Sequence, residues 1–377
     1  MPKKIALSLA ALAASALVAL AIGEGVVRVA YGRDMVMFPR YHTGARYGEY
    51  LLRTIRPHST FHHTSRDGTW EFVTNGRGFR DTREFSYDKP PGTVRVLALG
   101  DSHTQGYEAR QDHVFAAVLE RYLRHRGVQA EVLNTGVSGF GTAEELLFLE
   151  NEGVRYHPDY VVLALYANDY MDSVKSGLFG LDERGALKVL KKEHVPGVRA
   201  QDLLYSVPGV RWLGEHSYLY SLVFNGVWQL FKTRLAHEKA LEYAVAETGE
   251  VGDYETRLMA ALLERMHRFC SANGMELIVV DVPALAEGRP FESSVVPALR
   301  ETVRESSDAF LDSGATLSEL AGAVEIHVPH GHRHISEFTH LAIGTALGRV
   351  IQADLARHPR PATCAAPAPL AATPPGP

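Results

Sequence analysis

A serine in a tight turn is the first residue of this chain that could do chemistry. Gly100-Asp101-Ser102 follows directly on the segment 94–99, which is apolar except at one position. Such a segment is typical of a buried strand, and open α/β sheets bind their ligands at the carboxyl ends of their strands. A serine hydroxyl there can attack an acyl carbon once a base takes its proton. Ser102 is therefore the candidate nucleophile, with an ordinary turn as the alternative.

The candidate base lies near the C-terminus. His340 belongs to the sequence Glu337-Phe338-Thr339-His340, which follows the last predicted strand and opens the last predicted helix. A catalytic serine is usually activated by a histidine whose ring a carboxylate orients. Glu337 precedes this histidine by three residues, so one turn can direct both side chains toward the serine. We expect His340 to be the general base and Glu337 to orient it.

Two more turns are expected at the same edge of the sheet. The run 134–139 closes the second predicted strand and contains two glycines, and Asn168 lies in the turn that closes the third. Acyl transfer needs hydrogen-bond donors aimed at the oxygen of the tetrahedral intermediate, and a glycine N–H or an asparagine amide can supply them. Either turn alone could be an ordinary strand cap. Together with the serine, they indicate a site for acyl transfer.

The segments between these turns alternate between strand and helix patterns. Apolar runs predict strands and amphipathic stripes predict helices. The strands are expected at 94–99, 130–133, 160–166, 276–282 and 323–328, and the helices at 111–126, 142–149, 254–273 and 340–356. Strands without polar alternation, separated by helices, indicate a mostly parallel sheet covered on both faces. We therefore predict an α/β fold with three layers, an α/β/α sandwich.

The four turns occur in the order found in the SGNH, or GDSL, hydrolase superfamily, and the chain resembles that superfamily over residues 94–356. The resemblance implies a flavodoxin-like sandwich, with Ser102 as the nucleophile and His340 as the general base. It also implies an oxyanion hole formed by the N–H groups of Ser102 and Gly139 and by the side chain of Asn168. The glycine is the one that closes its turn.

Two positions depart from the superfamily pattern. Glu337 stands where an aspartate usually precedes the histidine, and His103 follows the serine in place of a leucine-like residue. A longer carboxylate can still orient an imidazole, or a backbone carbonyl could do so. The stretch 75–80, ahead of the first strand, resembles the leader of membrane-anchored bacterial members.

The N-terminus predicts export. Lys3 and Lys4 precede an apolar run from Ile5 to Ile22. At about 1.5 Å per residue this run nearly crosses a hydrocarbon core of about 30 Å, and it is longer than the core of a usual signal peptide. We expect a single-pass signal anchor in the cytoplasmic membrane, with a cleaved signal peptide as the alternative. Because the lysines hold the N-terminus in the cytoplasm, either form places the rest of the chain on the periplasmic or extracellular side.

Composition divides the chain into four parts. Residues 1–33 form the anchor or signal peptide, and 34–92 form a small β-containing segment. Residues 93–358 form the hydrolase-like domain, interrupted by an insertion at about 173–252 where the strand–helix rhythm is lost. Residues 359–377 are rich in proline and alanine with almost no charge, which predicts a disordered tail.

Composition also argues against other functions. A net charge of −5 without a dominant basic face argues against nucleic-acid binding. Two cysteines, Cys270 and Cys364, are too few for a disulfide framework or a cysteine-based zinc site. Four histidines crowd the stretch 327–334, but no cysteine and few carboxylates accompany them. Zinc binding there is one hypothesis, and a solvated loop is the favoured one. No metal or organic cofactor is expected.

These inferences converge on a carboxylic ester hydrolase. Two-step acyl transfer through Ser102 would remove short, acetyl-like acyl groups from cell-envelope carbohydrate or lipid. The same residues would serve an O-acyltransferase for exopolysaccharide, in which a sugar hydroxyl replaces water. A third hypothesis is a glycan-binding accessory protein that has lost turnover through the departures at 103 and 337.

Overall fold

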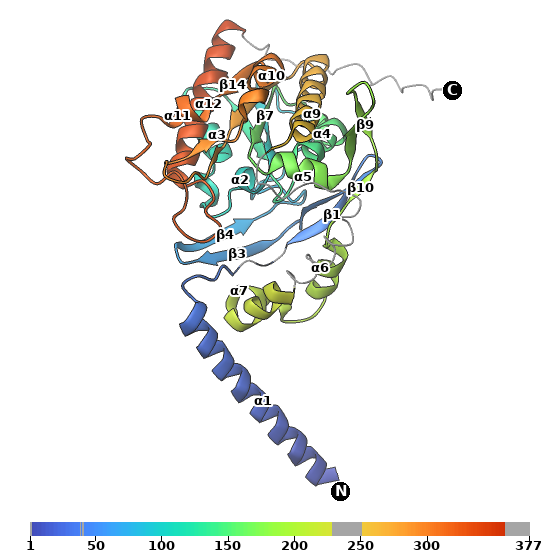
Figure 1. Cartoon of the computed structure of the whole chain (residues 1–377), viewed down its shortest axis with the longest axis vertical. Helices are drawn as coiled ribbons and strands as arrows, with labels where there is room; N and C mark the ends of the chain where they lie inside the picture. Colours follow the sequence, from blue (N-terminus) through green and yellow to red (C-terminus); the bar gives the residue numbers. More distant parts are fainter. Residues whose placement is uncertain (1, 38, 40, 228–250, 359–377) are drawn as a thin grey trace, which may run out of the picture.

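A computed structural model describes residues 2–37, 39, 41–227 and 251–358 (Figure 1). A long helix, α1 (Pro2–Tyr31), projects from the rest of the molecule. The predicted tail 359–377, with Cys364, and the middle of the predicted insertion, 228–250, lie outside the described residues.

The central sheet has five strands in the order β14-β11-β7-β5-β6, and every neighbouring pair is parallel. Its strands are β5 (Val94–Gly100), β6 (Ala130–Asn134), β7 (Tyr160–Leu165), β11 (Glu276–Asp281) and β14 (Ala309–Leu311). All residues of β5 and β7 are buried, as expected for strands with helices on both faces. The predicted parallel sheet is confirmed.

One predicted strand is wrong. The segment 323–328 is not a strand of the sheet, and β14 takes the edge position beside β11 instead. Within that segment the backbone makes only isolated bridges, one between Ala321 and Val324 and one between His327 and Ile335. The second bridge closes a loop, residues 327–335, that leads into the last helix. Of the apolar residues at 323–328, Ile326 and Val328 are buried, although neither belongs to a strand of the sheet.

Helices cover both faces of the sheet, so the predicted sandwich is confirmed. One face packs on α3 (Phe115–His125) and α12 (Glu337–Arg357), and the other on α4 (Thr142–Asn151), α5 (Asp169–Ser176) and α9 (Asp253–Ala272). Alternate residues of β5 divide between the two cores: Val96 and Ala98 face one, Leu97 and Leu99 the other. The remaining helical turns of this region are α2 (Ser102–Gln105), η1 (Gln111–His113), η2 (Gly153–Tyr156), η3 (Pro297–Leu299), α10 (Arg300–Glu305) and α11 (Ser313–Leu317).

Helices α3 and α12 approach each other closely because α12 has glycines at the contact. A Cβ on Gly344 would lie 2.7 Å from Val118 Cβ, and one on Gly348 would lie 2.2 Å from Tyr122 Cδ1. Because the two helices are so close, little room is left between them for the side chains of the first turns of α12.

The segment before the sheet forms two antiparallel hairpins. Strands β1 (His42–Tyr47) and β2 (Tyr50–Ile55) make the first, and β3 (Thr60–Ser65) and β4 (Gly68–Val73) the second. Aromatic residues of the hairpins, among them Phe61 and Phe72, are fully buried in the core that also contains Leu97 and Leu99 of β5. The hairpins are therefore part of the main hydrophobic core.

The insertion begins with short strands and continues as helices. It contains β8 (Phe179–Leu181), β9 (Leu187–Val189), β10 (Glu193–His194), α6 (Val198–Tyr205), α7 (Val210–His216) and a helical segment at 218–227. Outside the insertion, β12 (Pro283–Ala284) and β13 (Glu292–Ser293) form a small hairpin after β11. β10 pairs with β2 in parallel, which ties the insertion to the first hairpin. Helix α7 lies beside the end of α1 that joins the globular part, and α6 lies on the far side of α7 (Figure 1).

Candidate active site

Ser102 stands where the central strand β5 turns into the short helix α2. Gly100 ends the strand at φ +152°, and a Cβ there would lie 2.0 Å from Thr104 Oγ1, so the turn requires glycine. Asp101 caps the helix, and its carboxylate accepts the N–H of His103 at 2.8 Å. Ser102 is thereby the first residue of a helix and is only half-buried. The local sequence alone builds this turn.

The histidine in contact with this serine is His334. Its Nε2 lies 2.9 Å from Ser102 Oγ, within the distance that proton transfer requires. His334 belongs to the loop 327–335, which begins at the bridge from His327 to Ile335 and leads to Ser336, the N-cap of α12. Its side chain is 12% exposed, so the ring is mostly buried but still reaches solvent.

The structure places His340 away from Ser102. Its ring is fully buried between α12 and α3, where Nδ1 accepts the N–H of Phe115 at 3.2 Å. Burial lowers the pKa of His340 to about 3, so the ring is neutral at physiological pH. The reason is the start of α12. Ser336 caps the helix by accepting the N–H of Thr339, so residue 340 lies one turn inside the helix and faces α3.

Glu337 also lies away from the serine. Its carboxylate forms a bidentate ion pair with Arg110, with an Nε–Oε1 distance of 2.9 Å, and accepts the backbone N–H of the same residue. This contact joins the first turn of α12 to the segment before η1. Neither Glu337 nor His340 has a hydrogen bond or ion pair with Ser102 or His334 in the described part of the chain.

A different carboxylate faces His334. Glu108 Oε2 lies 3.4 Å from His334 Nδ1 and accepts the backbone N–H of the same residue at 3.1 Å, while Oε1 accepts the N–H of His332 at 2.8 Å. The Glu108 side chain is completely buried. Burial by itself raises the pKa of Glu108, but the hydrogen bonds from His334 and His332 outweigh it and the pKa is lowered. The carboxylate is therefore ionised and holds both the ring and the backbone of the histidine loop.

Glu108 takes the space that a side chain at position 331 would need. Gly331 precedes His334 by three residues, the spacing at which the superfamily usually places its aspartate. A Cβ on Gly331 would lie 1.9 Å from Glu108 Oε1, and the backbone there is left-handed, with φ +65°. The carboxylate beside the histidine thus comes from the loop after the serine, and glycine leaves room for it.

The segment 75–80 shapes this loop through Arg80. Its guanidinium donates hydrogen bonds to the backbone carbonyls of Gln105 at 2.8 Å and Ala109 at 2.7 Å, and also to that of Gly106. Burial lowers the pKa of Arg80 to about 9. Glu108 itself has a left-handed backbone, with φ +59°, which few residues other than glycine adopt without support. Arg80 supplies that support by binding the carbonyls on both sides of Glu108.

The predicted oxyanion-hole turns are both at the carboxyl edge of the sheet. The turn 134–139 packs on α2, because the Asn134 amide donates to Thr104 O at 2.8 Å and Gln105 Oε1 accepts the N–H of Ser138 at 2.9 Å. Gly139 has a left-handed backbone, with φ +76°, and a Cβ there would lie 2.4 Å from Nη2 of Arg53 on β2.

Asn168 precedes α5 and is half-buried. Its Nδ2 donates to Asp172 Oδ2 at 2.9 Å. The same side chain also forms a hydrogen bond with Asp101, so its amide is oriented by two carboxylates.

Buried carboxylates lie beneath the serine. Asp101, Glu145 and Asp169 are all buried, and for each of them burial raises the pKa above the ordinary value, with the neighbouring carboxylates adding to the rise for Glu145 and Asp169. His103, the unusual residue after the serine, is buried against the ring of Tyr166 at a centroid distance of 3.9 Å. Burial lowers its pKa well below the ordinary value, so it is a neutral wall of the site.

The histidines of the loop 327–334 have different partners. His327 Nε2 lies 2.9 Å from Pro283 O, His330 Nδ1 lies 2.7 Å from Asp67 Oδ1, and His334 faces Ser102. Within the described ranges, no three His, Cys, Asp or Glu side chains are grouped as metal ligands would be. The sequence did offer one signal for the histidine that contacts the serine. This signal was the crowding of histidines at 327–334, because His334 is one of them.

The α/β/α sandwich and the Gly-Asp-Ser turn at the end of β5 point to one family of hydrolases. The chain matches the model of the GDSL-like lipase/acylhydrolase family over residues 98–317, more than half of its length, and it belongs to that family. The predicted resemblance is thereby confirmed. Membership of this family supports a hydrolase that acts on ester bonds.

Solved structures to which this chain is similar include three esterases or lipases. The esterase EstA from Pseudoalteromonas sp. is 12% identical over 70% of this chain and 98% of its own, with a TM-score of 0.40. The lipase/acylhydrolase from Enterococcus faecalis is 17% identical over 69% and 96%, with a TM-score of 0.40. An acetylxylan esterase from Geobacillus stearothermophilus is 13% identical over 70% and 95%, with a TM-score of 0.39. No curated protein gave a significant match.

Proposed function

We propose that this chain is a membrane-anchored serine esterase that removes short acyl groups from cell-envelope carbohydrate or lipid, with Ser102, His334 and Glu108 as its catalytic triad. The observation that carries the proposal is the contact between Ser102 Oγ and His334 Nε2 at 2.9 Å. Because His334 Nδ1 faces the ionised Glu108, its proton is assigned to Nδ1, and Nε2 is free to accept the serine proton.

The first half of the reaction follows from this geometry. Ser102 Oγ attacks the ester carbonyl and its proton passes to His334 Nε2. Glu108 stabilises the imidazolium that forms. The tetrahedral intermediate collapses when the C–O bond to the alcohol breaks and the alcohol oxygen takes the proton from Nε2. The acyl group is then bound to Ser102.

In the second half, water replaces the alcohol and the same proton transfers run again, releasing the acid and restoring the serine. The negative oxygen of each intermediate would be held by the N–H groups of Ser102 and Gly139 and by the side-chain amide of Asn168. Each such donor is typically worth about 10²–10³ in rate. The position of Ser102 at the first residue of α2 supports its N–H group in this role.

The location of the reaction follows from α1. This helix is long and apolar enough to cross a membrane. Retained as an anchor, with its two N-terminal lysines in the cytoplasm, it would hold the catalytic domain at the outer face of the cytoplasmic membrane. The substrates within reach there are acyl esters of envelope glycans or lipids.

The test is labelling of the full-length, detergent-solubilised chain with a fluorophosphonate, followed by mapping of the adduct by mass spectrometry. We expect the adduct on Ser102, and its loss in His334→Ala but not in His330→Ala. Folded protein that takes no label would refute the esterase. Release of acetate from p-nitrophenyl acetate, measured with and without free acceptor sugar, would then separate hydrolysis from acyl transfer: acetylated sugar would show a transferase.

A further inference from the structure

Helix α1 is joined to the insertion by specific side-chain contacts near its C-terminal end. The carboxylate of Glu24 accepts the backbone N–H groups of Tyr218 and Leu219, both at 3.0 Å, and the hydroxyl of Ser217 at 2.8 Å. It therefore caps the N-terminus of the helical segment 218–227. The guanidinium of Arg28 lies 4.8 Å from the centre of the Tyr218 ring. The helix is thus fixed to the globular part.

These contacts place the insertion at a definite depth. The apolar run of α1 ends at Ile22, and none of its most apolar stretch is buried in the protein. A hydrocarbon core of about 30 Å takes about 20 helical residues. If the run 5–22 fills that core, Glu24 lies at the membrane surface, and the residues that it binds, 217–219, lie at the same level.

The helices of this region expose several large apolar side chains, together with the charged side chains of Arg199 and Arg211. Six large apolar side chains on α6, α7, the turn after α6 and the segment 218–227 are exposed to solvent in the structure: Leu203, Val207, Trp212, Leu222, Val223 and Val227. Trp212 is 60% exposed and Val223 57%. Such a group of exposed apolar residues next to a membrane helix is typical of a surface that contacts lipid, where tryptophan is enriched.

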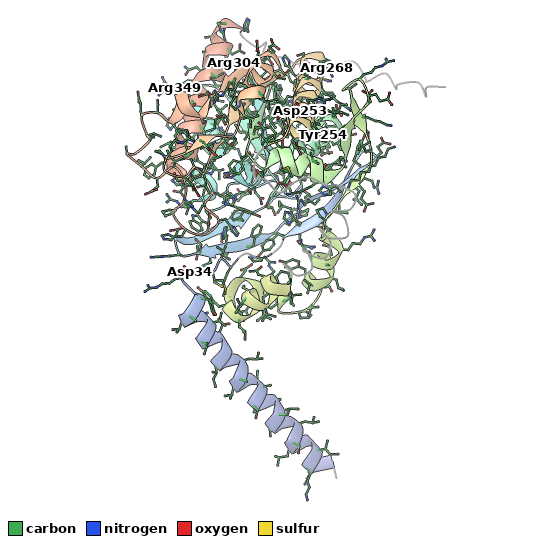
Figure 2. All side chains as sticks on the ribbon, viewed as in Figure 1. Asp34, Asp253, Tyr254, Arg268, Arg304 and Arg349 are labelled. Carbon is green, nitrogen blue, oxygen red and sulfur yellow. The ribbon has the colours of Figure 1, made fainter. Side chains whose placement is uncertain are left out.

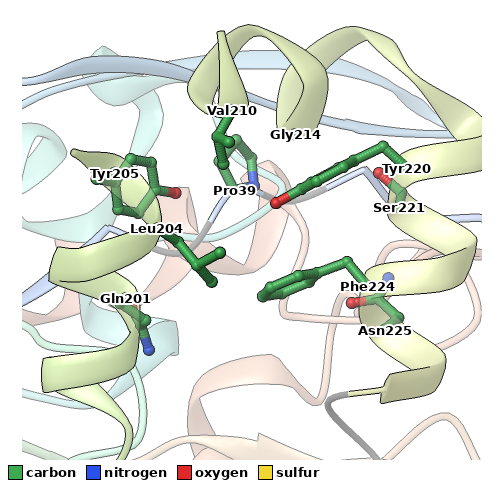
Figure 3. A pocket seen from close by; sticks show the side chains of 10 residues that line it. All are labelled: Pro39, Gln201, Leu204, Tyr205, Val210, Gly214, Tyr220, Ser221, Phe224 and Asn225. Carbon is green, nitrogen blue, oxygen red and sulfur yellow. The ribbon is translucent and has the colours of Figure 1, made fainter. Parts of the chain in front are cut away.

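The inner side of the same helices is apolar as well. Figure 3 shows Leu204, Tyr220 and Phe224 pointing toward one another between α6 and the segment 218–227. They line a narrow pocket closed by Val210 and Gly214 of α7. A helix that is apolar on both sides is normally buried on both sides. The inner side packs on the protein, and the outer side is left for the bilayer.

A groove connects this region to the catalytic loop. It has a volume of about 410 Å³ and is lined by Tyr31, Asp34, Met35, Val36, Leu222, Asn225 and His332. Its two sides therefore come from the end of α1 and from the segment 218–227. His332 donates its backbone N–H to Glu108 and lies two residues before His334.

We propose that α6, α7 and the segment 218–227 rest on the lipid bilayer beside α1, and that the ester reaches Ser102 from the membrane surface along the groove at His332. The substrate is then an acyl ester on a molecule held in the same leaflet by a lipid anchor. The occupant of the apolar face is the bilayer, because the face is continuous with a helix that is itself built for lipid. The substrate part of this inference rests on the proposed esterase.

The depth of the face can be measured on the full-length chain in phosphatidylcholine/phosphatidylglycerol vesicles. Nitroxide labels are attached to Trp212→Cys, Val223→Cys and, as the control, Arg349→Cys in a chain with Cys364→Ser. Arg349 is exposed and lies at the end of the molecule remote from α1 (Figure 2). We expect labels at 212 and 223 to be relaxed by oxygen rather than by a water-soluble nickel chelate, and the label at 349 to show the reverse.

Two results would overturn the bilayer contact. Labels at 212 and 223 could be as accessible to the nickel chelate as the label at 349. Dipolar broadening between labels on separate chains would instead show that a second copy covers the face.

The substrate class is tested with Trp212→Asp/Val223→Asp, which leaves every residue of the proposed triad in place. We expect kcat/KM for soluble p-nitrophenyl acetate to stay within about twofold, and hydrolysis of an acyl ester embedded in vesicles to fall by about tenfold or more, because loss of surface contact removes access. An equal change for both esters would overturn the membrane route. If the unaltered chain cleaves neither ester, the proposed esterase fails while the depth measurement still stands.

Discussion

The two halves of the candidate site are built in different ways. Ser102 is positioned by its own neighbours, since the strand β5, the glycine at 100 and the cap at Asp101 are contiguous in sequence. His334 is positioned by contacts from distant segments, because Glu108 binds its loop and Arg80 holds the backbone around Glu108. The proposed nucleophile therefore depends on local structure and the proposed base on tertiary structure. Substitutions around the base should test that difference best.

The largest effect is expected from His334→Ala. Removal of the base leaves Ser102 without a proton acceptor, and kcat/KM for p-nitrophenyl acetate should fall by at least about 10³-fold. His330→Ala is the matched control, because His330 belongs to the same loop but binds Asp67 at the surface. It should retain activity within about twofold, as surface substitutions usually do. Equal losses in the two variants would mean that the loop, and not the base, had been disturbed.

A smaller but still large loss is expected from Glu108→Gln. The substitution keeps the size of the side chain and removes the charge that orients and stabilises the imidazolium, so kcat should fall by about 10²-fold or more with little change in KM. Glu337→Gln should leave kcat nearly unchanged, since Glu337 pairs with Arg110. The two variants are compared by steady-state kinetics across pH. A larger loss of kcat in Glu337→Gln than in Glu108→Gln would instead support Glu337 as the carboxylate that orients the base.

Gly331→Ala tests the role of the Glu108 carboxylate by displacing it. A Cβ at 331 would lie 1.9 Å from Glu108 Oε1 and must displace it, so kcat should fall by about tenfold or more. Gly288→Ala is the control for backbone strain, because Gly288 also has a left-handed backbone, with φ +70°, but has no atom within 4 Å of a Cβ. Circular dichroism would show that both variants fold. If both had the same activity, Glu108 would not act on the base.

The smallest expected effect concerns stability and His340. Burial lowers its folded-state pKa to about 3 from an ordinary value of 6.5, so the unfolded chain binds a proton that the folded chain does not. The contribution of the neutral ring to stability is complete above pH 6.5 and is lost as the pH falls toward 3.

For this one group, the free energy of unfolding should be about 2 kcal/mol lower at pH 5 than at pH 7.5. His340→Asn should reduce that difference in urea titrations, with activity retained. If the free energy of unfolding of this variant changed with pH as in the unaltered chain, the buried ring of His340 would not cause the loss of stability at acid pH.

Much of the fold and half of the site could be predicted from the sequence. Unbroken apolar strands such as 160–166 allow only a covered parallel sheet, and the turn at Gly100 specifies the nucleophile locally. The start of α12 misled the prediction. Ser336 caps α12. Recognising this cap would have moved the predicted helix start from about 340 to 337 and left His334 in the loop before the helix.

Glu108 had no comparable local signal. Nothing in the sequence Gly106-Tyr107-Glu108-Ala109 indicates a left-handed backbone at the glutamate, since that conformation depends on Arg80. The crowded histidines were similarly ambiguous, because composition does not say which of four rings meets the serine. Long-range contacts decide both cases, and a single sequence does not contain them in readable form.

The order of the triad along the chain has a consequence for its synthesis. Ser102 and Glu108 lie close together in sequence near the start of the catalytic domain, whereas His334 comes close to its end. A ribosome therefore finishes the nucleophile and the carboxylate long before the base exists. On the proposed mechanism, the growing polypeptide cannot cleave an ester until almost all of it has been made, so activity begins only with a complete and folded enzyme.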